Sequence, residues 1–162
     1  MKSVAEFYEE RLYPLQDGVL KIVRDLNLPF YLTGGTALSR HFLHHRFSDD
    51  LDLFVNADDR FTVYVEQFTA VFQGKRSAFP FSIVEDSLVS APSYAGIHVA
   101  GYGTELKIDF VNDILSHFGE FEIVERLGRL GSWRNILSNK ISALSRFTEK
   151  DYIDVWALLK KI

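Results

Sequence analysis

Apolar residues recur three or four positions apart in several stretches of the chain, which is the spacing of one face of an α-helix. These stretches span residues 15–26, 61–72, 137–144 and 152–159. Pro14 marks a break or a start of the first helix. A break between the last two is expected at 147–149, where Thr148 and Asp151 have the spacing of a capping box. The final third of the chain is therefore expected to be helical.

Short apolar or alternating runs between these helices predict β-strands. The expected strands span residues 30–33, 51–55, 79–84, 94–100 and 105–111, and a turn at Gly101–Gly103 joins the last two. A further helix is expected at 37–45, with Thr36 as its N-cap. The pattern predicts an α+β fold, in which a mixed β-sheet carries helices packed on one side and is followed by a C-terminal helical segment.

Two glycines separate the first expected strand from the helix that comes after it. At Gly34 and Gly35 the missing side chains let backbone N–H groups approach an anion closely. The helix behind them adds the positive end of its dipole. A Gly-Gly-Thr sequence alone also fits an ordinary turn, because glycine is a common turn residue. Gly34, Gly35 and Thr36 therefore form a candidate phosphate-binding turn, and the case for it depends on the chemistry of the next strand.

Two acidic residues lie at that next expected strand. Side chains two positions apart share one face of a strand, so Asp50 and Asp52 are expected to point together. Aspartate is disfavoured in strands, so this pair needs a reason such as a metal or an ion pair. Mg²⁺ takes one or two carboxylates together with phosphate oxygens, so the pattern predicts metal-assisted nucleotidyl transfer. Asp49 has the opposite parity and is expected to be a turn residue or a partner of Arg46.

A late motif of basic and acidic residues completes the pattern. The chain resembles the AbiEii-type nucleotidyltransferases of the DNA polymerase β superfamily, and the residues that match in type and order are Gly34, Gly35, Thr36, Arg46, Ser48, Asp50, Asp52, Lys140, Arg146, Lys150, Asp151 and Asp154. Two features depart from the family. Thirteen residues separate Thr36 from Asp50, slightly more than usual, and the chain is shorter than many relatives, which carry extra C-terminal helices.

The resemblance implies a catalytic set, a nucleotide-binding set and a metal site. The implied catalytic residues are Asp50, Asp52, Asp109, Lys140 and Asp151. The implied nucleotide-binding residues are Gly34, Gly35, Thr36, Arg46, Ser48 and Lys140. Mg²⁺ or Mn²⁺ would be held by Asp50, Asp52 and Asp109, with an NTP as substrate. The family further implies toxin activity in a toxin–antitoxin pair, with RNA such as tRNA ends as the acceptor.

Each implied role has an ordinary structural alternative. Asp109 alternates with apolar residues and could be an exposed strand residue. As the third acid it would help orient or deprotonate the attacking hydroxyl. Lys140 would neutralise charge on the β- and γ-phosphates, or it could be a helix surface residue. Arg46 would contact phosphate or brace Asp50, and Ser48 would donate to a phosphate oxygen. Asp151 could simply cap its helix.

Length and composition bound the remaining classes. The chain has 162 residues, of which 47% are hydrophobic, enough for one domain with a core at about 1–125 and C-terminal helices at about 132–162. The absence of cysteine excludes disulfides and thiolate metal sites. No apolar run approaches the length of a membrane span, and acidic residues stand where a signal peptide needs an apolar stretch. A cytoplasmic protein is expected.

The net charge of −4 hides an asymmetry along the chain. Residues 1–125 hold 10 Lys and Arg against 19 Asp and Glu, whereas residues 126–162 hold 8 against 3. The basic tail, with Arg126, Arg129, Arg134, Arg146 and Lys150, could steer RNA toward the acidic metal-binding half, or it could be a solvated helix face. Acceptors other than RNA stay open, namely a small molecule or a protein hydroxyl. A non-catalytic nucleotide-binding module is a third possibility.

The histidines are expected to be structural. His41 and His45 have an i, i+4 spacing that could suit zinc, and His44 lies beside them. No Glu lies between them as in a His-Glu-x-x-His motif, and the sequence offers no third ligand nearby.

Overall fold

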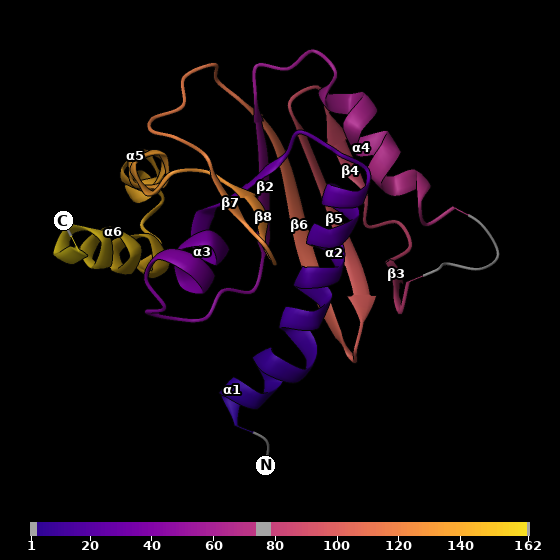
Figure 1. The fold of residues 1–162 in the computed structure, drawn as a ribbon, viewed down its shortest axis with the longest axis horizontal. Helices are drawn as coiled ribbons and strands as arrows, with labels where there is room; N and C mark the ends of the chain where they lie inside the picture. Colours follow the sequence, from indigo (N-terminus) through magenta and orange to yellow (C-terminus); the bar gives the residue numbers. More distant parts are fainter. Residues whose placement is uncertain (1–2, 74–78, 162) are drawn as a thin grey trace.

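The structure is a computed structural model that describes residues 3–73 and 79–161. Within this part of the chain, eight strands form one mixed sheet in the order β3-β5-β6-β2-β1-β8-β7, with β4 paired to β5 (Figure 1). The strands are β1 (Tyr31–Thr33), β2 (Leu51–Asn56), β3 (Phe81–Ile83), β4 (Val89–Ala91), β5 (Tyr94–Gly101), β6 (Thr104–Asp113), β7 (Glu122–Val124) and β8 (Gly128–Leu130). The predicted mixed sheet is confirmed, although β4, β7 and β8 were not expected.

The central strand β2 has one antiparallel and one parallel neighbour. It runs antiparallel to β1 and parallel to β6. Along β2, Leu51, Leu53 and Val55 are buried, whereas the side chains between them are partly exposed. Because side chains alternate between the two faces of a strand, one face of β2 belongs to the core and the other borders a cleft that includes Asp52 and Phe54.

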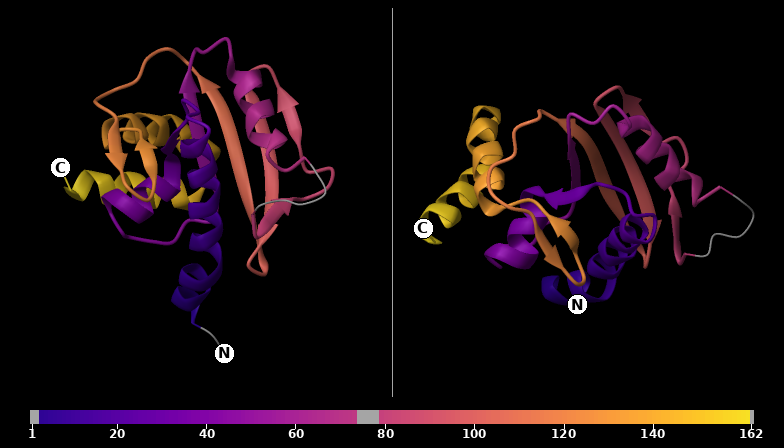
Figure 2. Two further views of the ribbon diagram at one scale, coloured as in Figure 1. Left: turned by 45° about the vertical axis from the view of Figure 1, so that its right-hand side comes forward. Right: turned by 45° about the horizontal axis from the view of Figure 1, so that its top comes forward.

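Helices α2 (Tyr13–Asp25) and α4 (Phe61–Ala70) cover the apolar face of the sheet (Figures 1 and 2). Their buried side chains, including Leu15, Val19, Phe61 and Phe68, belong to the same core cluster as the buried leucines of β2. This agrees with the predicted packing of helices on one side. None of the helices in the described ranges combines the length and the apolar character that crossing a bilayer requires.

The N-terminal helix is longer than the sequence pattern suggested. Helix α1 (Val4–Phe7), a π-helical turn (Tyr8–Leu12) and α2 come directly one after another. Pro14 therefore lies inside a continuous helical segment. The Tyr13 N–H donates to the Tyr8 carbonyl, the i to i+5 bond of a π-helical turn. This wider turn comes just before the proline, which has no N–H to donate.

The helix after β1 starts earlier than expected. It consists of α3 (Gly34–Ala37) and a π-helical turn (Leu38–Phe42). Its N-cap is Thr33, whose side chain makes no capping bond, so the expectation that Thr36 is the N-cap is wrong. Thr36 is buried, and its hydroxyl instead donates to the Asp50 carbonyl. That bond ties the helix to the start of β2.

A short hairpin, β7–β8, occupies residues that were expected to lie between the core and the C-terminal helices. Gly128 adopts a left-handed conformation (φ 79°) where the hairpin turns into β8. Leu130 pairs in parallel with Leu32 of β1, and both side chains are buried. The sheet of the core therefore extends to residue 130. Three-residue strands are too short to show a clear period of two, which is why the sequence pattern did not reveal them.

Two C-terminal helices, α5 (Trp133–Ala143) and α6 (Glu149–Lys161), lie at one end of the molecule (Figures 1 and 2). Ser132 caps α5 by accepting a hydrogen bond from the Asn135 N–H. A 3-10 turn (Leu144–Arg146) ends in Phe147, which has a left-handed conformation (φ 56°). The predicted break between the helices is thus confirmed within a few residues.

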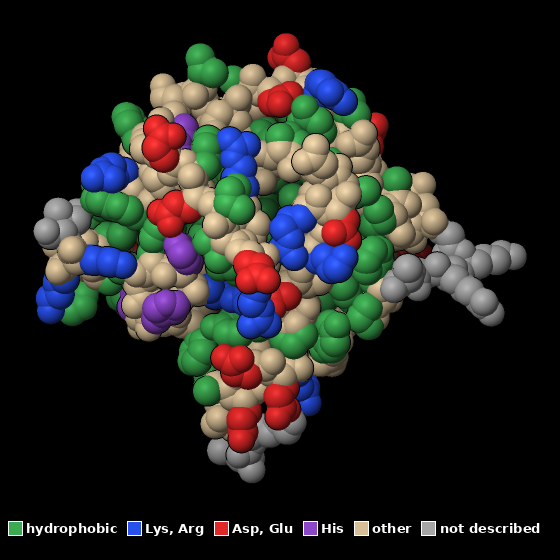
Figure 3. All heavy atoms as spheres, viewed as in Figure 1, with side chains coloured by type: hydrophobic (Ala, Val, Ile, Leu, Met, Phe, Trp, Pro, Cys, Tyr) green, Lys and Arg blue, Asp and Glu red, His purple; other side chains and the backbone are tan. Residues whose placement is uncertain are grey.

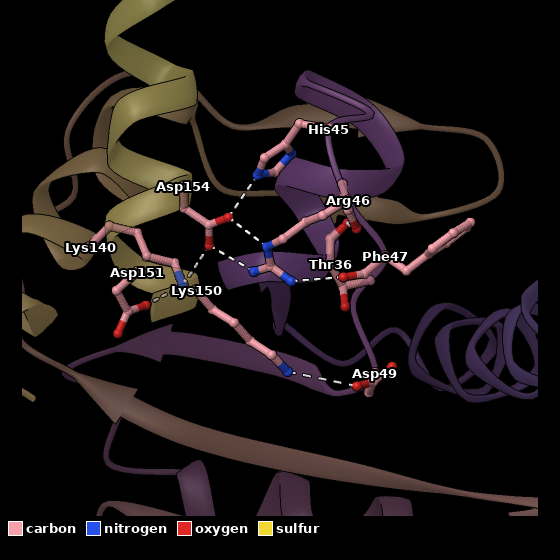
Figure 4. A network of polar contacts seen from close by, with 10 residues as sticks. Thr36, His45, Arg46, Phe47, Asp49, Lys140, Lys150, Asp151 and Asp154 are labelled. Atoms are coloured by element: carbon pink, nitrogen blue, oxygen red, sulfur yellow. Dashed lines mark hydrogen bonds and ion pairs between the residues drawn. The ribbon is translucent and has the colours of Figure 1, made fainter. Parts of the chain in front are cut away.

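A buried carboxylate holds α6 against the loop before β2. Asp154 is fully buried, and its two oxygens accept hydrogen bonds from Arg46 Nε (2.7 Å) and Arg46 Nη2 (2.8 Å). His45 Nε2 lies 2.7 Å from Asp154 Oδ1, and Lys140 Nζ lies 2.9 Å from Asp154 Oδ2 (Figure 4). Burial alone would raise the pKa of Asp154, but the hydrogen bonds from Arg46 and Lys140 outweigh burial and lower the pKa to about 2.

The same lysine also binds Asp151. Lys140 Nζ donates to Asp151 Oδ1 (2.7 Å), while the Thr148 hydroxyl donates to Asp151 Oδ2 (2.7 Å). Lys140 therefore connects α5 to two positions on α6. We call Arg46, Lys140, Asp151 and Asp154 the Asp154 network.

We predict that Asp154→Asn destabilises the fold at pH 7 by about 3 kcal/mol or more, because it leaves the largely buried charges of Arg46 and Lys140 without their shared partner. Urea unfolding measures this loss. Asp25→Asn is the matched control, since Asp25 forms an exposed pair with Lys21 that contributes little. Equal stability of the two variants would show that the network does not hold the C-terminal helices in place.

The same carboxylate gives a pH dependence. The folded pKa of Asp154, about 2, is below the ordinary value of 3.8. Its stabilisation is therefore fully present above about pH 4 and is lost as the pH falls through 2, a loss of about 2 kcal/mol. Unfolding midpoints measured from pH 7 down to pH 2 should fall less for Asp154→Asn than for the natural chain.

Candidate active site

Three strand positions meet on the open face of the sheet. Asp52 on β2 stands opposite Thr33 on β1, and on its other side it pairs in register with Asp109 on β6. Neighbouring strands are about 4.8 Å apart, so two in-register side chains on the same face are direct neighbours. The structure therefore brings Asp52 and Asp109 together.

Gly34 comes into close contact with this acidic pair. Its backbone is left-handed (φ 66°), a conformation that favours glycine. A Cβ at this position would overlap the Asp52 carboxylate. Two separate reasons therefore favour glycine at position 34. The left-handed backbone is one, and the close approach of Asp52 is the other. The candidate phosphate-binding turn and the candidate metal ligand are in direct contact.

A cleft of about 580 Å³ opens over these residues. The sheet contributes one wall, which includes Asp52, Phe54, Asp109 and Val111. The loop after β6 and helix α5 line the other side of the cleft. The lining also includes three charged residues of the C-terminal helical segment, Lys140, Arg146 and Asp151. Of the predicted site residues, the cleft lining includes Gly34, Asp52, Asp109, Lys140 and Asp151.

The Asp52 carboxylate is poorly compensated by the protein itself. Within the described ranges it accepts no hydrogen bond and forms no ion pair. Burial and the charge of Asp109 raise the pKa of Asp52 to about 6, against the positive charges of Lys140 and Lys107. A further cation beside Asp52 would relieve this repulsion.

Asp109 is instead held firmly. The Tyr94 hydroxyl donates to Asp109 Oδ1 (2.7 Å), and Lys107 Nζ donates to Asp109 Oδ2 (2.7 Å). The hydrogen bond to Asp109, together with burial, raises the pKa of Tyr94, so the phenol stays a donor at neutral pH. Gly96 stands in register with Asp109, and a Cβ there would lie 2.5 Å from the Tyr94 hydroxyl oxygen. Gly96 thus leaves the space in which Tyr94 reaches the acid.

Tyr94 and Gly96 were not singled out from the sequence. Their signal is the spacing of two along the strand expected at 94–100, which puts both on one face. The register that sets this face against Asp109 depends on the turn at Gly101–Gly103, so it became visible in the structure alone.

Asp50 does not line the cleft beside the acidic pair. It precedes β2, is exposed, and is not among the residues that line the cleft. Burial of part of the group raises the pKa of Asp50, while Lys107 opposes this. Among the residues that the structure describes, no group of three or more His, Asp or Glu side chains is arranged to hold a metal ion. Asp50, Asp52 and Asp109 are therefore not placed as one three-carboxylate cluster.

Arg46 and Ser48 lie beside the second glycine. An added Cβ at Gly35 would lie 2.6 Å from Arg46 Nη2 and 2.8 Å from Ser48 Oγ. Arg46 does not brace Asp50, because its guanidinium binds Asp154 and the Phe47 carbonyl (Figure 4). Ser48 is buried, and its carbonyl accepts a hydrogen bond from the Gln16 side chain (3.1 Å). Arg46 and Ser48 therefore pack against the turn at Gly35.

His41, His45 and Asp49 have partners within the protein. His45 lies against Asp154 and His41 against Glu122, with 2.9 Å between His41 Nε2 and the Glu122 carboxylate. Asp49 accepts a hydrogen bond from the Tyr8 hydroxyl and lies 3.7 Å from Lys150 Nζ, so its partner is not Arg46. These contacts agree with the expected structural role of His41 and His45.

The donor set of the cleft fits a hard divalent cation. Mg²⁺ is usually bound by one or two carboxylates plus substrate phosphates, and Asp52 and Asp109 supply two neighbouring carboxylates beside the Gly34 turn. Burial, and after it the repulsion from Asp109, raises the pKa of Asp52, and a bound cation would neutralise this charge. The chain has no cysteine, so a soft-metal thiolate site is excluded.

Two solved structures from Helicobacter pylori have a similar fold. One is a candidate nucleotidyltransferase, with 18% identity and a TM-score of 0.57, and the similarity covers 86% of this chain and 59% of that one. The other, JHP933, has 20% identity and a TM-score of 0.58, with 88% and 59% covered. At this identity the likeness shows the fold, which confirms the predicted class. The chain spans 59% of the length of each of these structures.

The sequence itself identifies the family. No curated protein is similar enough to count as a match. The model of the family described as nucleotidyl transferase AbiEii toxin, type IV TA system, matches residues 21–162. This range contains the Gly34 turn, both acids of the cleft and the Asp154 network. The chain therefore belongs to the AbiEii family of nucleotidyltransferase toxins, as its resemblance to that family implied.

Proposed function

We propose that this chain transfers a nucleoside monophosphate from an NTP to a hydroxyl acceptor. The observation that carries the proposal is the pairing of Asp52 with Asp109 directly beside the Gly34 turn, inside one cleft. A turn that can bind phosphates and two carboxylates that can bind Mg²⁺ are together what phosphoryl chemistry requires.

In the proposed reaction the acceptor oxygen attacks the α-phosphorus of the NTP, and pyrophosphate leaves. Asp52 and Asp109 would hold Mg²⁺, with Mn²⁺ as the alternative ion. When bound, the ion supplies charge neutralisation and polarisation at the reacting phosphate. Asp109, held by Tyr94 and Lys107, orients the acceptor hydroxyl or takes its proton. Gly34 and Gly35 offer backbone N–H groups to the phosphates.

Lys140 adds positive charge in the cleft. Its ammonium group has three donors, and two of them bind Asp151 and Asp154. The third is left for a terminal phosphate of the NTP. In this proposal Asp151 and Asp154 position Lys140, and Arg46, Ser48 and Thr36 support the backbone of the turn. Asp50 would act from the edge of the site, at the start of β2.

We further propose RNA, such as tRNA ends, as the acceptor, within the cytoplasm, and an antitoxin as the partner implied by the family. The chain's basic tail supports an RNA acceptor through Arg129 and Arg134, which lie against the rings of Phe121 and Trp133 and have no acidic partner in the described ranges. On the face shown in Figure 3, Lys and Arg side chains are interspersed with Asp and Glu. A small-molecule acceptor is the competing candidate, because the cleft is large enough for one.

We predict that Asp52→Asn abolishes nucleotidyl transfer while the chain stays folded, because the carboxylate is partly exposed and makes no stabilising hydrogen bond. Mg²⁺ should also strengthen NTP binding to the natural chain and not to this variant. Labelled NTP transfer and calorimetry with and without Mg²⁺ measure both effects. Full turnover by the variant, with unchanged thermal stability, would contradict the assignment of Asp52.

Tyr94→Phe is expected to lower kcat about tenfold to a hundredfold, because Asp109 loses one charge-assisted hydrogen bond. KM for the NTP should change little, since Tyr94 acts through Asp109 and not on the phosphates. Steady-state kinetics separate the two constants. Tyr102→Phe, an exposed tyrosine in the turn after β5, is the control and should behave as the natural chain.

The RNA proposal has a separate prediction. RNA binding should weaken steeply between low and physiological salt, because each phosphate contact releases counterions. The double variant Arg129→Ala with Arg134→Ala should flatten that slope and leave NTP affinity unchanged. Filter binding at several salt concentrations measures the slope. An unchanged slope would favour the small-molecule acceptor.

A further inference from the structure

Most of the side chains that α5 and the 3-10 turn after it contribute to the cleft are polar, with Ile136 and Ala143 as the apolar members. We call Ser138, Asn139, Ser142 and Arg146 the α5 stripe. Their spacing of one, three and four residues puts them along one side of the helical segment. A helix that faced the sheet for packing alone would carry an apolar stripe here. The neutral polar residues therefore call for a polar partner.

Three members of the stripe have unused hydrogen-bonding groups. Within the described ranges, neither the Ser138 hydroxyl nor the Asn139 amide has a hydrogen-bond partner, and the Arg146 guanidinium has no ion pair. Ser142 alone uses its hydroxyl locally, donating to the Ser138 carbonyl (3.1 Å). By contrast Lys140, on the same helix, contacts two carboxylates. Arg146 is thus the cation of the cleft lining whose charge is not matched by a protein carboxylate.

The opposite side of the same cleft presents apolar side chains beside its carboxylates. Phe54 and Val111 line it from the sheet, and Ile114 and Phe118 line it from the loop after β6. Ile114 and Phe118 are 70% and 54% exposed, which is high for such side chains. Flat apolar surface facing amide and hydroxyl groups is what binds a nucleobase, which has two apolar faces and a polar edge.

The cleft also has a direction. Phe118 lies at the start of α5, where its N–H donates to the Asn135 side chain (3.1 Å). Arg146 comes after the end of α5, eleven residues beyond Asn135, a helical distance of roughly 16 Å. The aromatic group and the free cation therefore lie at opposite ends of the stripe. Lys140 and Asp151 also line the cleft, and Lys140 lies between the two ends of the stripe. A nucleotide has the same polarity, with a base at one end and phosphates at the other.

We propose that the α5 stripe is the nucleotide-reading wall of the cleft. Asn139 and Ser138 bind the polar edge of the nucleoside, which stacks against Phe118, and Arg146 binds the terminal phosphates. This inference rests on the proposed nucleotidyl transfer and specifies how its NTP is recognised. It makes Asn139 the residue that ranks the bases and Arg146 the residue that distinguishes a triphosphate from a monophosphate.

The test is calorimetry with the full chain, Mg²⁺ and each of the four NTPs and NMPs. Arg146→Ala should weaken NTP binding about tenfold or more, because it removes charge-assisted bonds, and should change NMP binding less than about twofold. Arg60→Ala is the matched control, since Arg60 lies over the ring of Tyr64 and outside the cleft lining. It should bind every nucleotide as the natural chain does.

A second pair of variants tests the nucleoside end. Asn139→Ala should weaken NTP and NMP binding by the same factor and reduce the preference among the bases. Asn139→Asp, which keeps the shape but exchanges two donors for acceptors, should change the order of that preference. Ser145→Ala is the control, because Ser145 lies outside the cleft lining on the next turn. Thermal melting of every variant checks that it is folded.

The outcomes separate this inference from the proposed function. If the natural chain transfers nucleotides while Arg146→Ala and Asn139→Ala bind them normally, the α5 stripe is a solvated helix face and the inference is wrong. If the natural chain binds no NTP in the presence of Mg²⁺, both the function and the inference fail. An equal loss of NTP and NMP binding in folded Arg146→Ala would also contradict the assigned direction of the nucleotide.

Discussion

The repulsion between Asp52 and Asp109 is the constraint around which the site is arranged. Parallel pairing of β2 with β6 sets the two acids in register on one face of the sheet. Like charges directly opposite each other destabilise a sheet. The chain places hydrogen bonds on one of them, since Tyr94 and Lys107 both donate to Asp109, and leaves the other uncompensated. The resulting charge excess at Asp52 is the physical basis for assigning a metal ion to this cleft.

The Asp154 network explains how the C-terminal helices come to border that excess charge. Asp154 binds Arg46, which lies just before β2, and Lys140, which lies on α5. One buried carboxylate thus fixes α6, α5 and the loop that leads into Asp52. Burying three charged groups is costly unless each is paired and hydrogen-bonded, and here each of them is. The network therefore serves to position the cleft. The charge of Lys140, which lines the cleft, is already partly neutralised by Asp151 and Asp154 in the absence of a phosphate.

Sequence reasoning reached the fold class and the family, because these depend on local signals. The Gly34 turn and Asp52 are recognisable within some twenty residues, and the amphipathic period of α4 is strong. The partners of these residues were harder to predict. Arg46 binds Asp154, which is 108 positions away, so nothing local distinguishes this pair from the expected bracing of Asp50. Asp50 was grouped with Asp52 by parity, but it precedes β2, where strand alternation no longer sets the direction of its side chain, and it lies at the surface.

The register between paired strands was equally hard to predict from the sequence. That Tyr94 reaches Asp109 depends on the length of the turn between β5 and β6 and on Gly96, and neither signals chemistry by itself. Short strands such as β8 depend on pairing with β1 and carry little pattern of their own. The residues that contact one another across the cleft are therefore the ones that required a structure.

The arrangement of charge also bears on how the substrates are told apart. Along the cleft the carboxylates of Asp52, Asp109, Asp113 and Asp151 outnumber the cations Lys140 and Arg146, and Lys140 is already paired with Asp151. Such a surface repels a free polyanion, so in the proposed mechanism a triphosphate would bind there together with a divalent cation and Arg146. A polyanionic acceptor has no equivalent compensation inside the cleft and would approach from outside it. Within the proposed mechanism, the nucleotide and an RNA acceptor are thereby kept on separate surfaces, which meet at Asp52 and Asp109.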